Sequence, residues 1–257
     1  MVPTFPLDPS ALRTGRPLFP ASIIEEPLTA YHGTSGQFGE RIERDGLQAD
    51  VMALQREDLA AVAHVFEQMR WCGVAWDGYA ILRPFSLDFD YATADGRQRR
   101  VYLAETSFRA ATYAGVGFAG GEAVRAVRLS LCDLQQYVDD PEVRKEHIRQ
   151  QEVEAALTGQ SVVEPSVAWV REQLAALERI SRVCSDADAQ HQYGIVYALR
   201  FDPAGFASLE RHGGMGIISK TPISPDRIVA KVIIPRGLER PALCEDKERL
   251  KREDLWA

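Results

Sequence analysis

Two short stretches, separated by about seventy residues, carry the side chains best suited to binding a ligand. The first reads Tyr-His-Gly-Thr-Ser over residues 31–35, and the second reads Val-Tyr-Leu-Ala over residues 101–104. Both have the pattern of strands that end in small residues, where a flat ligand can come close enough to bond a backbone N–H or C=O. His32 and Tyr102 each add a side chain that pairs with hydroxyls. Together the two stretches predict the floor of a ligand-binding cleft.

The residues that follow each stretch extend it into a longer motif. His32-Gly33-Thr34 is followed by a segment, residues 36–44, that can form a helix, and then by Gly46-Leu47. Residues 102–114 run from Tyr-Leu-Ala into a segment that ends with Tyr113-Ala114. In this order the motifs resemble the first two motifs of the ADP-ribosyltransferases of the poly(ADP-ribose) polymerase and diphtheria-toxin type. The resemblance implies an α+β fold, an ADP-ribosyltransferase-like split β-sheet core with helical insertions, and NAD as the substrate.

The resemblance also implies a role for each motif residue. His32 would bond a hydroxyl of the adenosine ribose, and the backbone of Gly33 would bond the nicotinamide amide, to which Thr34 adds a further bond. Tyr102 and Tyr113 would enclose the nicotinamide ring between aromatic faces. The remaining implied NAD contacts are Ala104 and, on the adenine side, Gln37 and Gln48. The three motif positions to which the family assigns catalysis fall on His32, Tyr102 and Met215.

The sequence departs from the family pattern in two places. Ala110 stands where many members have a serine that bonds the nicotinamide amide. The third motif normally begins a strand with a glutamate, and the aligned residue here is the apolar Met215, ahead of Gly216-Ile217-Ile218. A missing glutamate favours a single transfer over chain elongation. Three residues are candidates to replace it: Glu210 and His212, which lie close to Met215 in sequence, and Glu105, which lies in the second motif. Each of these residue types is also common in purely structural positions.

Several functions are consistent with these motifs. The first is a mono-ADP-ribosyltransferase that transfers ADP-ribose from NAD to a macromolecular acceptor, protein or nucleic acid, in the manner of a toxin-type effector with a neutralising partner protein. The same fold serves NAD glycohydrolases and RNA 2′-phosphotransferases. A catalytically silent module that binds NAD or ADP-ribose is the alternative from another class, favoured by Met215 and Ala110. The arginines at 97, 99 and 100 suit a phosphate-bearing target, and they suit a solvated flank of a hairpin equally well.

The composition restricts the partners and the compartment. With 37 acidic and 30 basic residues the formal net charge is −7, which argues against a whole-molecule electrostatic binder of DNA or membranes. No apolar run reaches membrane-spanning length, and the N-terminus lacks the layout of a signal peptide. The four cysteines have no paired spacing, so we expect reduced thiols, no metal site and a cytoplasmic setting.

The pattern along 257 residues predicts one domain with an insertion. Residues 1–26 are rich in proline and predict an extended lead-in, and residues 27–257 predict a single domain with a helical insertion at about 139–185. Residues 71–95 are dense in aromatics, which favours a packed insertion over a loop that lines a cleft. Strands are expected at 28–34, 101–104, 123–131, 194–201, 216–220 and 228–234, and helices at 36–44, 55–70, 106–114 and within 139–183.

Overall fold

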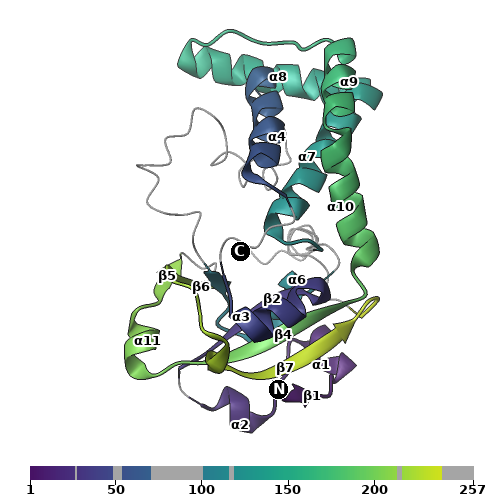
Figure 1. Cartoon of the computed structure of the whole chain (residues 1–257). Coiled ribbons are helices and arrows are strands. Elements are labelled where there is room, and N and C mark those ends of the chain that lie inside the picture. Colours follow the sequence, from purple (N-terminus) through teal and green to yellow (C-terminus); the bar gives the residue numbers. More distant parts are fainter. Residues whose placement is uncertain (27, 49–53, 71–100, 116–118, 213–215, 239–257) are drawn as a thin grey trace. The chain divides into compact units, whose positions relative to one another are not determined.

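The computed structural model describes residues 1–26, 28–48, 54–70, 101–115, 119–212 and 216–238. These residues form a mixed α/β fold, as the sequence predicts, and divide into two compact units (Figure 1). We call them the sheet unit, drawn from residues 1–51, 96–121 and 188–257, and the helical unit, drawn from residues 52–95 and 122–187. The predicted insertion at 71–95 and the arginines at 97, 99 and 100 lie outside the described residues.

The described residues of the sheet unit form two β-sheets. The larger has the strand order β1-β7-β4-β2, with β1 parallel to β7 and the other pairs antiparallel. The smaller has the order β3-β6-β5 and is antiparallel throughout. The strands are β1 Thr4–Phe5, β2 Thr29–Ser35, β3 Val101–Leu103, β4 Tyr193–Arg200, β5 Glu210–His212, β6 Gly216–Ser219 and β7 Ile228–Pro235. The strands expected around 28–34, 101–104, 194–201, 216–220 and 228–234 are therefore confirmed.

Short helices cover both faces of the larger sheet. Along β2 and β4 successive side chains point to opposite faces. One face packs Tyr31 and Val196 with α1 and α6, and the other packs Ala30 and Ile195 with α3. The helices of this unit are α1 Pro9–Thr14, α2 Ala21–Ile24, η1 Gly36–Phe38, α3 Gly39–Asp45, α6 Ser107–Tyr113, α11 Pro203–Ala207 and η5 Pro225–Arg227.

The N-terminal lead-in is not wholly extended. Residues 1–26 contain β1, which pairs with β7, and the two helices α1 and α2. Asp8 caps α1 by accepting a hydrogen bond from the Ser10 N–H at 2.8 Å, and Pro9 suits the first helical turn because it needs no N–H there. Leu12, Phe19 and Ile23 are buried in the core under the sheet, so apolar burial outweighs the proline-rich composition.

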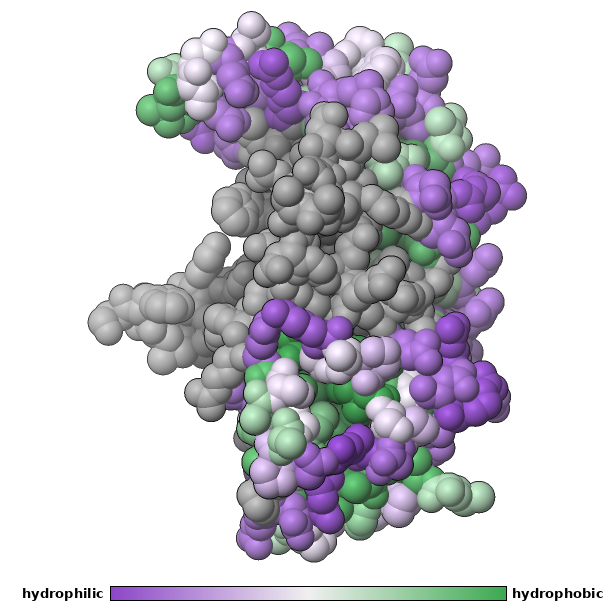
Figure 2. Space-filling view, turned by 60° about the vertical axis from the view of Figure 1, so that its left-hand side comes forward, coloured by the Kyte–Doolittle hydropathy of each residue, from purple (hydrophilic) through white to green (hydrophobic). Residues whose placement is uncertain are grey.

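The described residues of the helical unit include five helices. They are α4 Arg56–Met69, α7 Glu122–Asp139, α8 Pro141–Thr158, α9 Val167–Ala176 and most of α10 Glu178–Gln190. Of these, α4, α7, α9 and α10 share one apolar core, in which Phe66, Leu134, Val170 and Ile180 are buried. In Figure 2 hydrophilic residues cover much of the described surface that is seen, in keeping with an enclosed apolar core. None of the helices in the described part of the chain has both the length and the apolar character needed to span a bilayer.

The prediction of a strand at 123–131 is wrong, because these residues belong to helix α7. The alternation of valine and leucine over nine residues resembles a strand, but the apolar positions continue at helical spacing. Val124, Val127, Leu134 and Val138 lie along one side of α7 and are all buried. A window that extends to residue 138 therefore indicates a helix, and only the shorter window suggests a strand.

Replacing Asp133 of α7 by asparagine should stabilise the protein increasingly as pH rises. Burial raises the pKa of Asp133 to about 7, and its Oδ2 accepts no hydrogen bond within the described structure. The unfolded chain ionises this group near pH 4 and the folded chain only near pH 7, so wild-type stability falls across that interval. An amide carries no such charge, so the gain in melting temperature of Asp133→Asn should be larger at pH 8 than at pH 5.

The control for this measurement is Asp186→Asn, which changes an exposed carboxylate on α10. Its melting temperature relative to wild type should vary little between the two pH values. An equal gain for Asp133→Asn at pH 5 and pH 8 would contradict the buried charge as its cause.

Candidate functional site

The two stretches that carry His32 and Tyr102 lie side by side in the sheet unit. The Tyr31 N–H donates to the Ala104 carbonyl at 2.9 Å, and the Ala104 N–H donates to the Tyr31 carbonyl at 2.7 Å. This pair of bonds joins the edge strand β2 of the larger sheet to the end of β3 in the smaller one. The residues at this junction are therefore brought together from positions about seventy apart in sequence.

His32 is held at the junction by a hydrogen bond to the neighbouring strand. Its Nδ1 lies 2.9 Å from the backbone carbonyl of Tyr102, and since a carbonyl oxygen only accepts, Nδ1 carries the proton. Burial lowers the pKa of His32, and the bond to the carbonyl partly opposes this. The ring is thus neutral at pH 7, which leaves Nε2 as an acceptor for a ligand hydroxyl.

Gly33 brings helix α6 into close contact with β2. A Cβ added at Gly33 would lie 1.7 Å from the carbonyl oxygen of Ala110 and 3.1 Å from the amide nitrogen of Ala114. Ala110 is fully buried in this contact, so its side chain is out of reach of a ligand. Packing alone therefore explains the glycine at position 33 and is sufficient reason for a small residue at position 110.

The backbone of Gly33 faces the junction. In a strand the N–H and C=O groups of successive residues point to alternate edges. Those of Tyr31 point to Ala104, so those of Gly33 point to the same edge of β2, away from β4. A carboxamide at this edge would meet one backbone donor and one backbone acceptor from the same residue.

Tyr102 presents its ring to solvent beside this edge. In β3 the flanking Val101 and Leu103 are buried, while Tyr102 is 46% exposed. Tyr113 is the last residue of α6 and is partly exposed. A Cβ added at Gly216, opposite the end of β3, would lie 2.4 Å from the Leu103 carbonyl oxygen, and Gly216 has φ 122°, so only glycine fits at the start of β6.

The other predicted NAD contacts are distributed around the junction. Thr34 and Ala104 are nearly buried, and Gln37 and Gln48 are exposed. The Gln48 Nε2 donates to the Asp45 carbonyl at 3.3 Å, a weak bond at the end of α3. Met215 lies outside the described residues, as does the side chain of His212. In the described chain no three His, Cys, Asp or Glu side chains form a metal-binding group.

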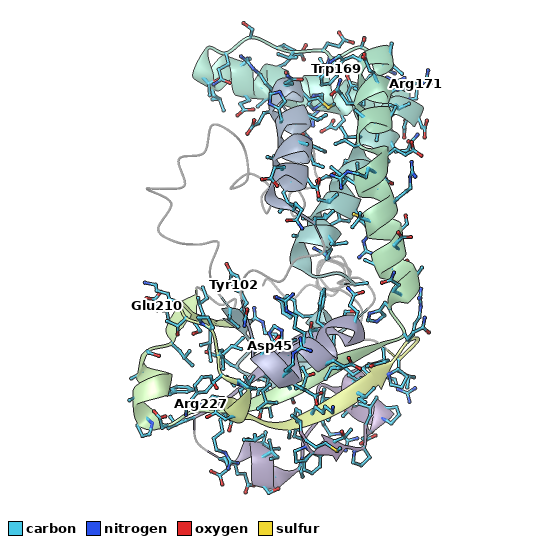
Figure 3. All side chains as sticks on the ribbon, viewed as in Figure 1. Asp45, Tyr102, Trp169, Arg171, Glu210 and Arg227 are labelled. Atoms are coloured by element: carbon cyan, nitrogen blue, oxygen red, sulfur yellow. The ribbon has the colours of Figure 1, made fainter. Side chains whose placement is uncertain are left out.

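Glu210 lies in the same cross-strand row as Tyr102. Ile218 of β6 pairs with Tyr102 on one side and with Glu210 of β5 on the other, so the three side chains point to one face of the smaller sheet. Two strand spacings separate Glu210 from Tyr102, about 10 Å. Glu210 forms an ion pair with Lys220 at 2.6 Å. Figure 3 shows Tyr102 and Glu210 on the same side of this sheet. Glu105 is exposed in the turn after β3.

No known protein family, curated protein or solved structure matches this chain. A function must therefore be argued from the junction itself. The arrangement offers a neutral histidine, a backbone donor and acceptor, an exposed tyrosine ring and a carboxylate on the same sheet as that ring. These groups suit a ligand that combines hydroxyls, a carboxamide and a flat ring.

The sequence does not indicate a cluster of three polar side chains that lies next to His32, on the side of β2 opposite to β3. On the face of the larger sheet that carries His32, the Tyr197 hydroxyl of β4 and the Lys231 Nζ of β7 both donate to the Glu43 Oε1 of α3. The three residues lie more than thirty positions from one another in sequence and belong to no local motif. Only the strand register brings them together, so no local pattern in the sequence could have indicated them.

Proposed function

We propose that this protein is a NAD-dependent mono-ADP-ribosyltransferase that transfers ADP-ribose to a macromolecular acceptor. The observation that carries the proposal is the bond from the His32 Nδ1 to the Tyr102 carbonyl, beside the Tyr31–Ala104 bridge. It joins the two motifs that resemble those of ADP-ribosyltransferases at one point. Among the described residues the two sheets are separate and are linked there by the Tyr31–Ala104 bridge, which is consistent with the split sheet that the resemblance implies.

The groups at the junction match the parts of NAD. The neutral His32 accepts at Nε2 a hydrogen bond from a hydroxyl of the adenosine ribose, the Gly33 N–H and C=O bond the carboxamide, and the Tyr102 ring stacks on the nicotinamide. These contacts hold both ends of NAD and so fix the nicotinamide and its ribose relative to the acceptor. Holding reactants in such an orientation supplies a large part of a rate enhancement, because the entropy cost is met on binding.

The reaction is a displacement at C1′ of the nicotinamide ribose. The bond from C1′ to the nicotinamide nitrogen breaks, and its electron pair leaves with neutral nicotinamide. The resulting oxocarbenium ion accepts a lone pair from an O–H or N–H of the acceptor, which loses its proton to a carboxylate or to water. A carboxylate near C1′ stabilises the positive charge that develops before the new bond forms.

Glu210 is the carboxylate that we assign to this role, in place of the glutamate for which the sequence has Met215. Glu210→Gln should lower the rate of transfer by about 10²-fold with little change in the KM for NAD, because the lost charge acts in the transition state. The measurement is steady-state transfer of labelled ADP-ribose. Glu105→Gln changes the nearest alternative acid and should retain most activity. A large loss in Glu105→Gln and none in Glu210→Gln would reverse the assignment.

The function itself is tested by incubating the purified protein with NAD and following nicotinamide release, with and without a cell lysate or RNA. Release that requires the lysate or RNA, together with label fixed to a macromolecule, would support the transferase and name the class of acceptor. Release without an acceptor would identify an NAD glycohydrolase instead. Absence of release under all conditions would contradict an enzyme and leave the binding module.

A further inference from the structure

A polar cluster lies on the face of the larger sheet that carries His32. The Tyr197 hydroxyl lies 3.2 Å from the Glu43 Oε1 and 3.4 Å from the Gly39 carbonyl oxygen. The Lys231 Nζ donates to the same Glu43 oxygen at 2.5 Å. Tyr197 is fully buried, and the side chains of Glu43 and Lys231 are only 23% and 16% exposed. The cluster thus links α3 to two strands of the sheet.

The strand register places this cluster directly beside His32. His32 of β2 is paired with Tyr197 of β4, and Tyr197 is paired with Lys231 of β7. Directly opposite residues in antiparallel strands point to the same face, with their Cβ atoms about 5 Å apart. The side chains of His32, Tyr197 and Lys231 therefore form one row across three strands. Glu43 reaches down from α3 to the last two.

The cluster holds α3 to the sheet with polar groups, whose burial costs hydration free energy that apolar residues would not lose. The neighbouring positions on this face of β4 are Ile195 and Leu199, which pack through apolar contact alone. A tyrosine hydroxyl and an ion pair in the same row lose hydration on burial, and such pairs add little net stability over apolar residues of similar size. Burial and the Glu43 carboxylate together raise the pKa of Tyr197, so its hydroxyl stays protonated and donates. Stability alone does not account for this choice of residues.

We propose that Tyr197, Glu43 and Lys231 are positioning residues that hold the His32 ring against the Tyr102 carbonyl. The Tyr197 hydroxyl is held by Glu43, and Glu43 is held by Lys231, so the side chain paired with His32 across the two strands has a fixed position. The imidazole itself is bonded through Nδ1 to the Tyr102 carbonyl. The catalytic consequence rests on the proposed function, whereas the position of the ring does not.

The first experiment measures the His32 ring by NMR titration of the whole protein, with its signals identified by their loss in His32→Ala. In wild type the pKa of His32 should lie below the ordinary value of about 6.5, because the ring is buried. In Tyr197→Phe and in Glu43→Gln we expect the His32 ring to lose its support and to tilt toward water, so the pKa of His32 should rise toward about 6.5. Lys231→Arg, which keeps a cation at Glu43, should behave like wild type.

The control is Asp202→Asn, which removes an ion pair with Arg227 in the same unit without touching the row of His32. The His32 titration should not change in this variant. An unchanged His32 titration in both Tyr197→Phe and Glu43→Gln would overturn the proposal, since a purely structural cluster would alter the melting temperature alone. The comparison needs no NAD turnover, so it remains decisive even if the proposed function fails.

The second experiment compares kinetics in the same variants. Tyr197→Phe removes only the hydroxyl and keeps the ring volume, so the fold is retained. We expect its KM for NAD to rise several-fold more than its kcat falls, because a misplaced histidine weakens a contact made in the ground state and the transition state alike. An equal kcat and KM in wild type and Tyr197→Phe would overturn the catalytic part of the proposal.

Discussion

Replacing His32 by alanine should reduce NAD-dependent nicotinamide release by about 10²-fold or more, the largest loss expected from one side chain at this site. The substitution removes the bond from the His32 Nδ1 to the Tyr102 carbonyl and, under the proposed function, the acceptor for a hydroxyl of the adenosine ribose. Both losses act together, because one ring provides both nitrogens. The measurement is nicotinamide release under single-turnover conditions with NAD below its KM, where a loss of binding and a loss of chemistry both lower the observed rate.

A matched control for this variant is His64→Ala. His64 lies on α4 in the helical unit, is exposed, and is bonded to Gln68 at 2.8 Å. Its replacement should leave NAD turnover unchanged. Equal rates for wild type and His32→Ala, with both proteins folded, would remove His32 from the site and with it the proposed function. Equal losses in His32→Ala and His64→Ala would indicate damage to folding instead.

The sequence predicts this site well where neighbouring residues decide the structure. Strand β2 and helix α6 are both indicated by local patterns, and Thr106 caps α6 by accepting a hydrogen bond from the Arg109 N–H at 3.1 Å. The residue types of the two stretches predict that both form the floor of one cleft. The bridge between Tyr31 and Ala104 shows that the two stretches lie side by side. The implied ligand remains a proposal.

The parts that the sequence does not indicate depend on distant residues. Strand β4 follows the helical insertion and still pairs with β2 from Thr29 to Ser35, so Tyr197 reaches His32 only through the complete chain. The row of Tyr102, Ile218 and Glu210 likewise requires the register of three strands. The error at 123–131 has a different cause, because a short window of valine and leucine fits two periodicities equally well.

The His-Gly pair illustrates how a motif can carry two explanations. The glycine is consistent with a backbone that bonds a ligand, but its close approach to Ala110 explains it without any ligand. Gly194 on the neighbouring strand shows the same packing, since a Cβ there would lie 1.8 Å from the Ala114 carbonyl oxygen. Two glycines on adjacent strands therefore form the surface on which α6 rests. A substitution at Gly33 is therefore expected to change the stability of the fold, whether or not Gly33 also binds a ligand.

Gly33→Ala should destabilise the protein by about 3 kcal/mol, the upper part of the usual range for overpacking. The atom that the new Cβ would meet at 1.7 Å is a backbone oxygen of α6, which cannot move without the helix. Ala110, Ala111 and Ala114 are fully buried, so moving the helix would open gaps in the core on that face. The free energy of unfolding is measured by denaturant titration, with circular dichroism as the signal. In a separate thermal scan the melting temperature should fall by roughly 5–10 °C.

Gly205→Ala provides the matched control in the same unit. Gly205 lies within α11, and its added Cβ would come no closer than 3.3 Å to the Asp202 carboxylate, which is a side chain that can move. An alanine in a helix is favoured over glycine, so stability should stay the same or rise slightly. A stable, folded Gly33→Ala that binds no NAD would show that the ligand, and not α6, requires the glycine. An unstable Gly33→Ala would instead mean that the His-Gly pair cannot serve as evidence for NAD binding, and that the assignment depends on His32, Tyr102 and Glu210.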